Sequence, residues 1–348
     1  MSEQQHPTRA GATGYVYDPI FLQHSKTGHA EHAQRLETIL SALDTAGLRE
    51  LLHAVPARPA TEAELLAGHS REHLHRVQES CRAGGGQLDA DTYTTPQSYA
   101  AATVAAGSVI ALTLAALDGD IKNGFACVRP PGHHATRGQA LGFCVFNNIV
   151  LAAKAAQIQR QVERIAIVDF DVHHGNGTQA LVERDPQILF ISTHQMPLYP
   201  GTGEMREIGG ARNVINIPLA FGSGDQVFKR VYQEIVVPAV TRFAPQLILV
   251  SAGYDAHWGD PLASLGLTLT GQAWIAQTLV ALAETVCAGR IVLTLEGGYN
   301  LKTLGIGVAN TVKALLGRAD MADPAGLSPR REPDVTPLIA ALKTLHQL

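Results

Sequence analysis

Residues Ile165–Gly177 read Ile-Ala-Ile-Val-Asp-Phe-Asp-Val-His-His-Gly-Asn-Gly, and they decide how the chain is organised. The run opens with apolar, β-branched residues, which are typical of a strand covered on both faces. Asp169, Asp171 and His173 then alternate with apolar residues, so a continuing strand would project all three to one side. Two carboxylates and an imidazole before a Gly-rich turn predict half of a metal site.

Ordinary structural roles exist for each of these residues. A single Asp at a strand end is commonly a helix cap, and a single His is commonly a core or surface residue. Two unpaired carboxylates in an otherwise apolar strand would cost several kcal/mol each in lost hydration. The combined pattern therefore favours metal binding.

Predicted strands and helices alternate on both sides of this stretch. The predicted strands span 15–17, 124–128, 164–172, 187–192, 213–218, 246–251 and 290–295. The predicted helices span 33–48, 98–117, 146–161, 178–183, 225–243, 271–287 and 301–316, with a short one opening at the Thr61-x-x-Glu64 capping box and a final one after 318. Residues 84–96 are predicted to form a loop. This alternation predicts an α/β fold with a mostly parallel sheet flanked by helices on both faces.

The chain has 348 residues, of which 46% are hydrophobic and 17% charged, so we expect a large core. No linker or repeat divides it, which predicts a single domain over 15–348 after a disordered tail at 1–14. The net charge of −4 argues against a nucleic-acid partner. Four cysteines without CxxC spacing fit reduced thiols, and no signal peptide or membrane-length segment is expected. We therefore expect a cytoplasmic protein without a membrane partner, and the composition and short tail look bacterial.

Polar clusters follow four of the predicted strands. They are Arg129-Pro-Pro-Gly-His133-His134, Asp169 through Asn176, Ser251-Ala-Gly-Tyr-Asp255 and Glu296-Gly-Gly-Tyr299. Each cluster alone has an ordinary explanation, such as a Gly-Gly turn or a capping Asp. Ligands of parallel α/β sheets bind at the carboxyl ends of the strands. We therefore expect the four clusters to meet in one site.

These motifs, together with Gly142-Phe-Cys-Val-Phe-Asn-Asn148 and Gly259-Asp-Pro-Leu262, resemble the zinc-dependent histone deacetylase and acetylpolyamine amidohydrolase family. The resemblance covers roughly residues 15–316 and implies the arginase-like fold. Within the family, the sequence is similar to the class II-like branch of bacterial histone deacetylase-like amidohydrolases. It implies that Asp171, His173 and Asp255 are zinc ligands. Three protein ligands leave a position open for water and a substrate carbonyl. Iron(II) is a possible substitute, because nitrogen and oxygen ligands do not select zinc alone.

The resemblance also assigns catalytic residues. His133 would face Asp169 and stay protonated, whereas His134 would face Asn176 and stay neutral. His134 would then act as general base and later as general acid. Many family members carry Asp where this chain has Asn176, and Asn is the class II-like pattern. The hydroxyl of Tyr299 would stabilise the oxyanion.

Further residues match the family's substrate tunnel. Gly142, Phe143 and Tyr199 would line a slot for the lysine stem, although many relatives have Phe in place of Tyr199. Leu262 occupies the gatekeeper position, where acetylpolyamine-selective members carry Glu. A leucine favours an acyl-lysine or another neutral amide.

The remaining matches concern ions and the rim of the tunnel. A structural potassium site would involve Asp169, Asp171, His173, Ser192 and Thr193. Arg35 resembles the arginine of the acetate channel, and its alternative is an ordinary helix-surface arginine. Asp89 or Asp91 would be the rim carboxylate. The usual His-Pro-Glu pattern appears as His29-Ala-Glu-His32, which changes the expected entrance loop.

The sequence thus predicts a zinc-dependent hydrolase that releases a free amine and a carboxylate from an Nε-acyl-lysine or a similar acyl amide. The expected partner is an acyl-lysine peptide or a small acyl amide, and a homo-oligomer is possible. The main alternative is an acetylpolyamine amidohydrolase. An arginase-like dinuclear manganese enzyme needs further bridging aspartates, and a non-enzymatic binding protein would be expected to have lost some site residues.

Overall fold

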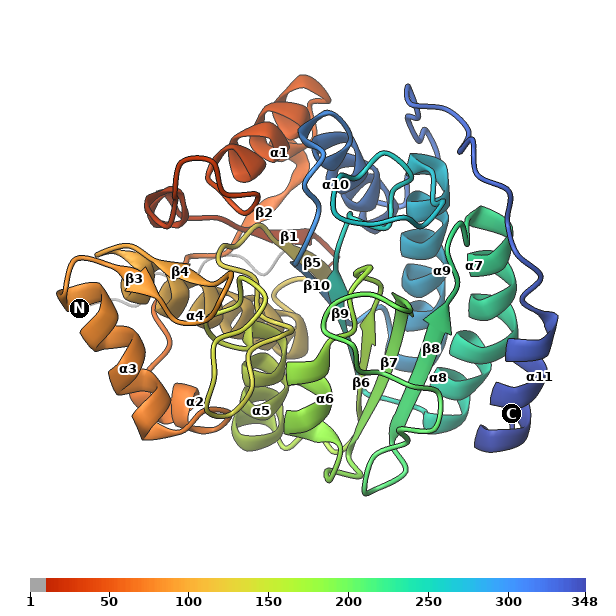
Figure 1. Cartoon of the computed structure of the whole chain (residues 1–348), viewed down its shortest axis with the longest axis horizontal. Coiled ribbons are helices and arrows are strands. Elements are labelled where there is room, and N and C mark those ends of the chain that lie inside the picture. Colours follow the sequence, from red (N-terminus) through yellow and green to blue (C-terminus); the bar gives the residue numbers. More distant parts are fainter. Residues whose placement is uncertain (1–10) are drawn as a thin grey trace.

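The computed structural model describes residues 11–348, and its centre is an eight-stranded sheet in the order β2-β1-β5-β10-β9-β6-β7-β8 (Figure 1). Every neighbouring pair in this sheet is parallel. The strands are β1 (Thr13–Val16), β2 (His53–Ala54), β5 (Asn123–Ala126), β6 (Ile165–Asp169), β7 (Ile188–Gln195), β8 (Val214–Leu219), β9 (Leu247–Ala252) and β10 (Ile291–Leu295). The prediction of an α/β fold with a mostly parallel sheet is confirmed.

Helices cover both faces of the sheet (Figure 1). One face carries α4 (Ser98–Asp118), α5 (Asn148–Arg160) and α6 (Asn176–Val182). The other carries α1 (Gln34–Thr45), α7 (Asp225–Val231), α8 (Val237–Phe243), α9 (Leu269–Cys287) and α10 (Leu301–Leu315). The last helix, α11 (Thr336–His346), packs outside this layer on the π-helical segment Tyr232–Val236.

Shorter elements complete the fold beside α4 and α1. These are α2 (Glu62–Leu66), α3 (Arg71–Arg82), the antiparallel pair β3 (Gly86–Gln87) and β4 (Tyr93–Thr94), and the 3-10 turns Pro19–Gln23 and Arg49–Leu51.

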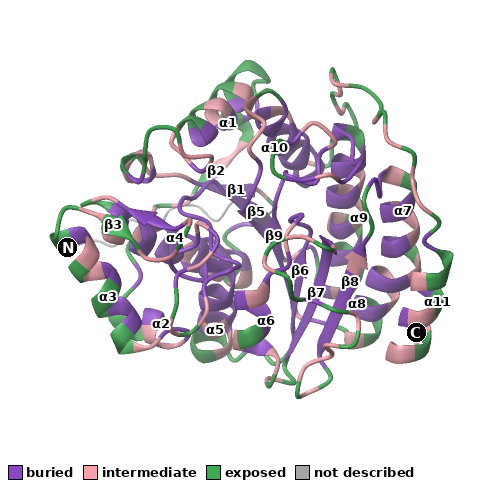
Figure 2. Cartoon of the chain, in the orientation of Figure 1, coloured by how far each residue is buried: buried purple, intermediate pink, exposed green. Residues whose placement is uncertain are grey.

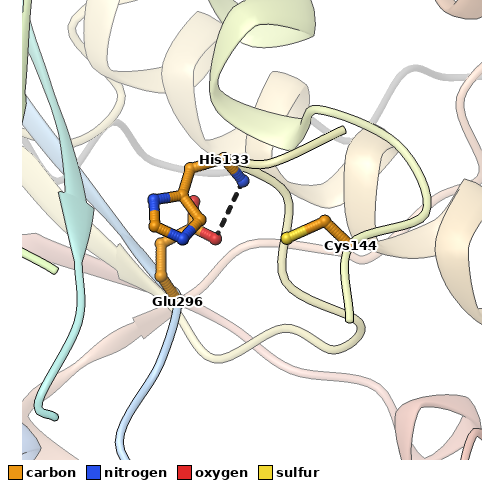
Figure 3. A group of neighbouring side chains, drawn as sticks. All are labelled: His133, Cys144 and Glu296. Carbon is orange, nitrogen blue, oxygen red and sulfur yellow. Dashed lines mark hydrogen bonds between the residues drawn. The ribbon is translucent and has the colours of Figure 1, made fainter. Parts of the chain in front are cut away.

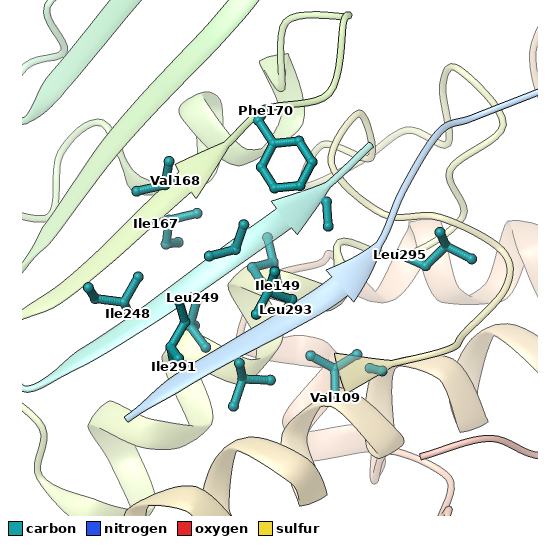
Figure 4. Packing of buried hydrophobic residues seen from close by; sticks show 14 of the residues in the cluster. Val109, Ile149, Ile167, Val168, Phe170, Ile248, Leu249, Ile291, Leu293 and Leu295 are labelled. Atoms are coloured by element: carbon teal, nitrogen blue, oxygen red, sulfur yellow. The ribbon is translucent and has the colours of Figure 1, made fainter. Parts of the chain in front are cut away.

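The core lies between the sheet and its two helical layers, and the central strands are buried along their whole length (Figure 2). Ile167, Leu249 and Leu293 project from the neighbouring strands β6, β9 and β10, while Val109 and Ile149 approach them from α4 and α5 (Figure 4). Full burial of such a side chain contributes about 1.5–3 kcal/mol. This core makes the sheet a rigid support for the loops at its edge.

Helix α4 is the one helix in residues 11–348 that is long and apolar enough to cross a membrane. The expectation that no segment reaches that length was therefore wrong. However, 67% of its most apolar window is buried inside the fold. Its small side chains pack against α5 and the strands β1, β5 and β10, as in the core helix of a folded domain.

Four other details differ from the sequence-based expectations. Strand β6 ends at Asp169 and not at 172, because the Asp169 carboxylate accepts the backbone N–H of Asp171 at 3.1 Å and turns the chain out of the sheet. Helix α3 was not predicted, and the predicted loop at 84–96 contains β3 and β4. The first strand starts at Thr13, inside the predicted tail, and residues 1–10 of that tail lie outside the described part.

Candidate active site

Four loops that follow adjacent strands build the candidate active site. Strands β5, β10, β9 and β6 are neighbours in the sheet, and their polar clusters come directly after them. Asp169 is level with Ser251 on β9, and Ser251 is level with Thr294 on β10. The strand ends therefore bring segments more than a hundred residues apart to one edge, as expected for ligand sites in parallel sheets.

Asp171, His173 and Asp255 form the candidate metal centre. One donor atom from each lies within 4.8 Å of the other two. The Nδ1 of His173 is 3.0 Å from Oδ1 of Asp171 and 3.4 Å from Oδ2 of Asp255. That Oδ2 is buried and has no hydrogen-bond partner within residues 11–348. A divalent cation would satisfy this oxygen, so the donor set fits a metal of the zinc type.

Two glycines make room for these carboxylates. A Cβ at Gly297 would lie 2.0 Å from Oδ2 of Asp255 and 2.6 Å from Oδ2 of Asp171. A Cβ at Gly253 would lie 2.1 Å from the same Asp171 oxygen. The backbone N–H of Gly297 donates to that oxygen at 2.8 Å. The glycines of the Ser251–Asp255 and Glu296–Tyr299 motifs are thus required by the space that the carboxylates occupy.

His133 and His134 lie beside the metal centre with their rings 4.0 Å apart. The Nδ1 of His133 is 3.0 Å from Oδ2 of Asp169, and the Nδ1 of His134 is 2.7 Å from Oδ1 of Asn176. Burial lowers the pKa of His133, but the charges of Asp169 and other carboxylates outweigh it and raise the pKa to about 10. Burial and the neighbouring His133 hold the pKa of His134 well below its ordinary value.

Glu296 is a residue of the site to which sequence reasoning gave no role. Its Oε2 accepts the backbone N–H groups of Gly132 and His133 at 2.7 and 3.2 Å, and Ser251 donates to its Oε1 at 3.0 Å. Figure 3 shows the backbone nitrogen of His133 pointing at this carboxylate, with Cys144 near by. Donor atoms of His133, Cys144 and Glu296 also lie within 4.8 Å of one another.

This second cluster braces the site and does not form another metal centre. The hydrogen bonds just described occupy both oxygens of Glu296. Burial also raises the pKa of the Cys144 thiol, which disfavours the thiolate that a metal needs. Glu296 therefore fixes the backbone at His133.

Tyr299 and Arg35 pack against each other in the candidate active site. The Arg35 guanidinium sits 4.9 Å from the centre of the Tyr299 ring, and the Phe143 ring meets that ring edge-on at 5.7 Å. Arg35 is fully buried and donates to the carbonyl oxygens of Glu296 and Gly298 at 2.6 and 2.7 Å. It is therefore not the helix-surface arginine that the sequence left open as an alternative.

Aromatic rings surround the approach to the metal centre. The Tyr199 ring packs edge-on against His134 at 5.0 Å, and a Cβ at Gly142 would collide with both of these rings. Phe143 adopts a left-handed backbone with φ 69°, and its ring lies 4.7 Å from that of His29. Leu262 is 38% exposed at the surface. Aromatic side chains thus lie against the polar residues of the site.

Comparisons with known proteins identify the family. The histone deacetylase domain family matches residues 29–315. Histone deacetylase 14, chloroplastic, of Arabidopsis thaliana is 39% identical over 94% of this chain and 83% of its own length. A histone deacetylase-like amidohydrolase of Pseudomonas aeruginosa is 40% identical over 82% of this chain and 75% of its own. The crystal structure of the HDA15 HD domain superposes with a TM-score of 0.89 at 34% identity, covering 97% of this chain and 94% of that one.

The chain belongs to the histone deacetylase family. It is a hydrolytic deacetylase of the amidohydrolase type, and its fold is the deacetylase fold.

The sequence did not predict a buried charge cluster around Glu31, although Glu31 lies in the His29-Ala-Glu-His32 segment that was compared with the family pattern. Glu31 of the His29-Ala-Glu-His32 segment pairs with Arg129 and with Arg35, which donates at 3.1 Å. The Nε2 of His29 lies 3.0 Å from the carbonyl oxygen of Asp91. A lone glutamate gives no sequence signal of such burial, because the arginines that partner it come from distant segments or from the next helical turn.

The residues matched to a potassium site lie at and just after the end of β6 and within β7. Ser192 is level with Asp169, and Thr193 Oγ1 donates to the Asp169 carbonyl oxygen at 3.3 Å. Burial raises the pKa of the Tyr199 hydroxyl, and the charges of Asp91 and Asp89 raise it further. The potassium site and the choice of rim carboxylate remain predictions.

Proposed function

We propose that this deacetylase hydrolyses Nε-acyl-lysine amides with a zinc ion held by Asp171, His173 and Asp255. The observation that carries the proposal is the buried Oδ2 of Asp255, which has no hydrogen-bond partner among the described residues and lies beside the donors of the other two residues. When bound, the cation polarises the acyl carbonyl and lowers the pKa of the attacking water. Iron(II) suits the same donors, and a potassium ion beside Asp169 belongs to the same proposal.

His134 is the proposed proton carrier. With its Nδ1–H donated to Oδ1 of Asn176, its Nε2 keeps a lone pair that takes a proton from the water. The same nitrogen then gives that proton to the leaving amine. The depressed pKa of His134 keeps the ring neutral before the reaction starts.

His133 and Tyr299 have complementary roles in this scheme. His133 stays an imidazolium, because its Nδ1–H donates to Asp169, and its charge stabilises the negative charge that develops on the substrate. The Tyr299 hydroxyl donates to the acyl oxygen as the carbonyl carbon becomes tetrahedral. Burial raises the pKa of this hydroxyl well above its usual value, so it remains protonated.

The slot formed by Phe143 and Tyr199 suits the methylene stem of a neutral acyl-lysine. Leu262 at its rim offers no charge to the distal ammonium of a polyamine. A cytoplasmic location is part of the proposal, since the four cysteines are all free and buried.

The decisive experiment assays zinc-loaded protein on acetyl-, trifluoroacetyl- and longer acyl-lysine peptides beside acetylspermidine. We expect the higher kcat/KM on an acyl-lysine. A large preference for acetylspermidine would replace this substrate class with acetylpolyamines. A metal content near two per chain would favour a dinuclear manganese enzyme, and inactivity towards the whole panel would favour a binding protein.

A further inference from the structure

A cavity of about 540 Å³ shares no lining residue with the deacetylase site. It is bounded by the start of β7 at Leu189, the start of β8 at Asn213, the end of α8 and the end of α11. The deacetylase loops leave the sheet at the carboxyl ends of its strands, so this cavity lies at the opposite end. Its volume is within the range of small-molecule sites.

The charged side chains of this lining, Arg212 and Arg242, are basic. Arg212, Arg242 and His346 line the cavity, and no Asp or Glu is among its lining residues. Neither arginine forms an ion pair with a carboxylate within residues 11–348. Arg242 donates one N–H to the carbonyl oxygen of Gln347, at 2.8 Å. Two like charges around one cavity repel each other, and a bound anion would remove that repulsion.

Details of the backbone and of the neighbouring side chains support a binding role. Arg212 has a φ of 55°, a left-handed conformation that is strained for an arginine and is often kept for function. His346 Nε2, at the wall of the cavity, is buried without a hydrogen-bond partner in the described chain. Burial, followed by the charges of Arg212 and Arg242, lowers the pKa of His346, so both guanidinium groups act on this ring.

The rest of the lining is mostly apolar. It includes Leu189, Ile215, Ala239, Phe243 and Leu345. A bare inorganic ion would leave these side chains in contact with water. An occupant that matches the whole cavity has an anionic end for the arginines and an apolar end for this wall.

We propose that this cavity binds a small organic anion, a carboxylate or phosphate joined to an apolar group, with Arg212 and Arg242 holding its charged end. Guanidinium groups suit both anions because they present paired N–H donors. The proposal is independent of the substrate and metal of the deacetylase site.

Isothermal titration of the full chain with octanoate, octanamide and inorganic phosphate tests the proposal. We expect octanoate to bind at least tenfold more tightly than either of the others. Arg212→Asn, which tolerates the left-handed backbone, and Arg242→Gln are each expected to weaken octanoate binding tenfold or more. Arg82→Gln, an exposed arginine on α3, is the matched control and is expected to bind as the unaltered chain does.

Three outcomes would overturn the proposal. Octanoate binding that persists in both variants would place it elsewhere, for example at the deacetylase site. Octanamide binding equal to that of octanoate would remove the charge requirement, and phosphate binding equal to that of octanoate would remove the apolar one. Thermal unfolding of each variant without ligand, together with its deacetylase rate, establishes that the chain is folded.

Discussion

The ring of Tyr299 packs between Arg35 and Phe143, so its hydroxyl is the part left to act on substrate. We expect Tyr299→Phe to lower kcat by about 10²–10³, the usual effect of losing one oxyanion donor. KM and the thermal unfolding midpoint should change little, because the ring contacts remain. Steady-state kinetics on an acetyl-lysine peptide would measure this, and an unchanged kcat would exclude Tyr299 from the mechanism.

Asn176 determines how easily His134 is protonated. We expect Asn176→Asp to raise the pKa of His134, because a carboxylate beside Nδ1 favours the imidazolium. A general base must be neutral, so the acidic limb of the kcat/KM profile should move to higher pH by about 1–3 units. Profiles of both proteins between pH 5 and 9 would be compared, and a limb that stays in place would contradict the role of His134.

The turns at the strand ends leave the space that the candidate metal-binding carboxylates occupy. We expect Gly297→Ala, in the turn after β10, to reduce zinc affinity by about 10–100-fold, since the new Cβ would displace the Asp255 and Asp171 carboxylates. Competition with a chromophoric chelator would measure the affinity. Gly138→Ala is the matched control, because nothing lies within 4 Å of its Cβ position. Equal affinities would mean that these oxygens are not ligands.

Helix α2 offers a test of stability against pH. Thr61 and Glu64 form a capping box, and the hydrogen bond from Arg58 is the largest effect that lowers the pKa of Glu64, to about 2. Because the folded-state pKa lies below the ordinary 4.5, the stabilisation is complete above pH 4.5 and is lost as pH falls towards 2. The difference in unfolding free energy between the unaltered chain and Glu64→Gln should therefore shrink over that range. A difference independent of pH would contradict this reading.

Sequence patterns predicted most of these elements, because buried parallel strands leave short apolar runs and core helices leave long ones. They failed at the end of β6, because the Asp169 side chain ends that strand although the alternation of apolar residues continues beyond it. They also failed at α3, whose buried face holds only His73, Leu74, Val77 and Cys81 in a mainly polar helix. The candidate metal ligands were named from their motifs, and the structure brings their donor atoms within 4.8 Å of one another. Glu296 and Glu31 became recognisable only when distant partners were placed around them.

At the scale of the whole molecule, Glu31 joins the N-terminal segment to the strand ends. Its carboxylate lies between Arg129, Arg35 and His24, and all four side chains are buried. We expect Glu31→Gln to destabilise the protein by about 3–5 kcal/mol, because two buried guanidinium groups lose their counter-charge. Glu62→Gln, which breaks an exposed pair with Arg71, should cost less than about 1 kcal/mol. Urea unfolding of both variants would decide, and equal losses would contradict the prediction.

The order of strands in the sheet differs from their order in the chain. Strand β10, the last to be synthesised, inserts between β5 and β9 and supplies part of the cover for α4. A nascent chain therefore leaves the ribosome with part of the 21-residue apolar helix α4 uncovered and with a gap in the middle of its sheet until residue 295 has emerged. Exposed apolar surface and unpaired strand edges are the features that chaperones shield. Production of this protein should accordingly depend on chaperone capacity far more than the stability of the finished fold would suggest.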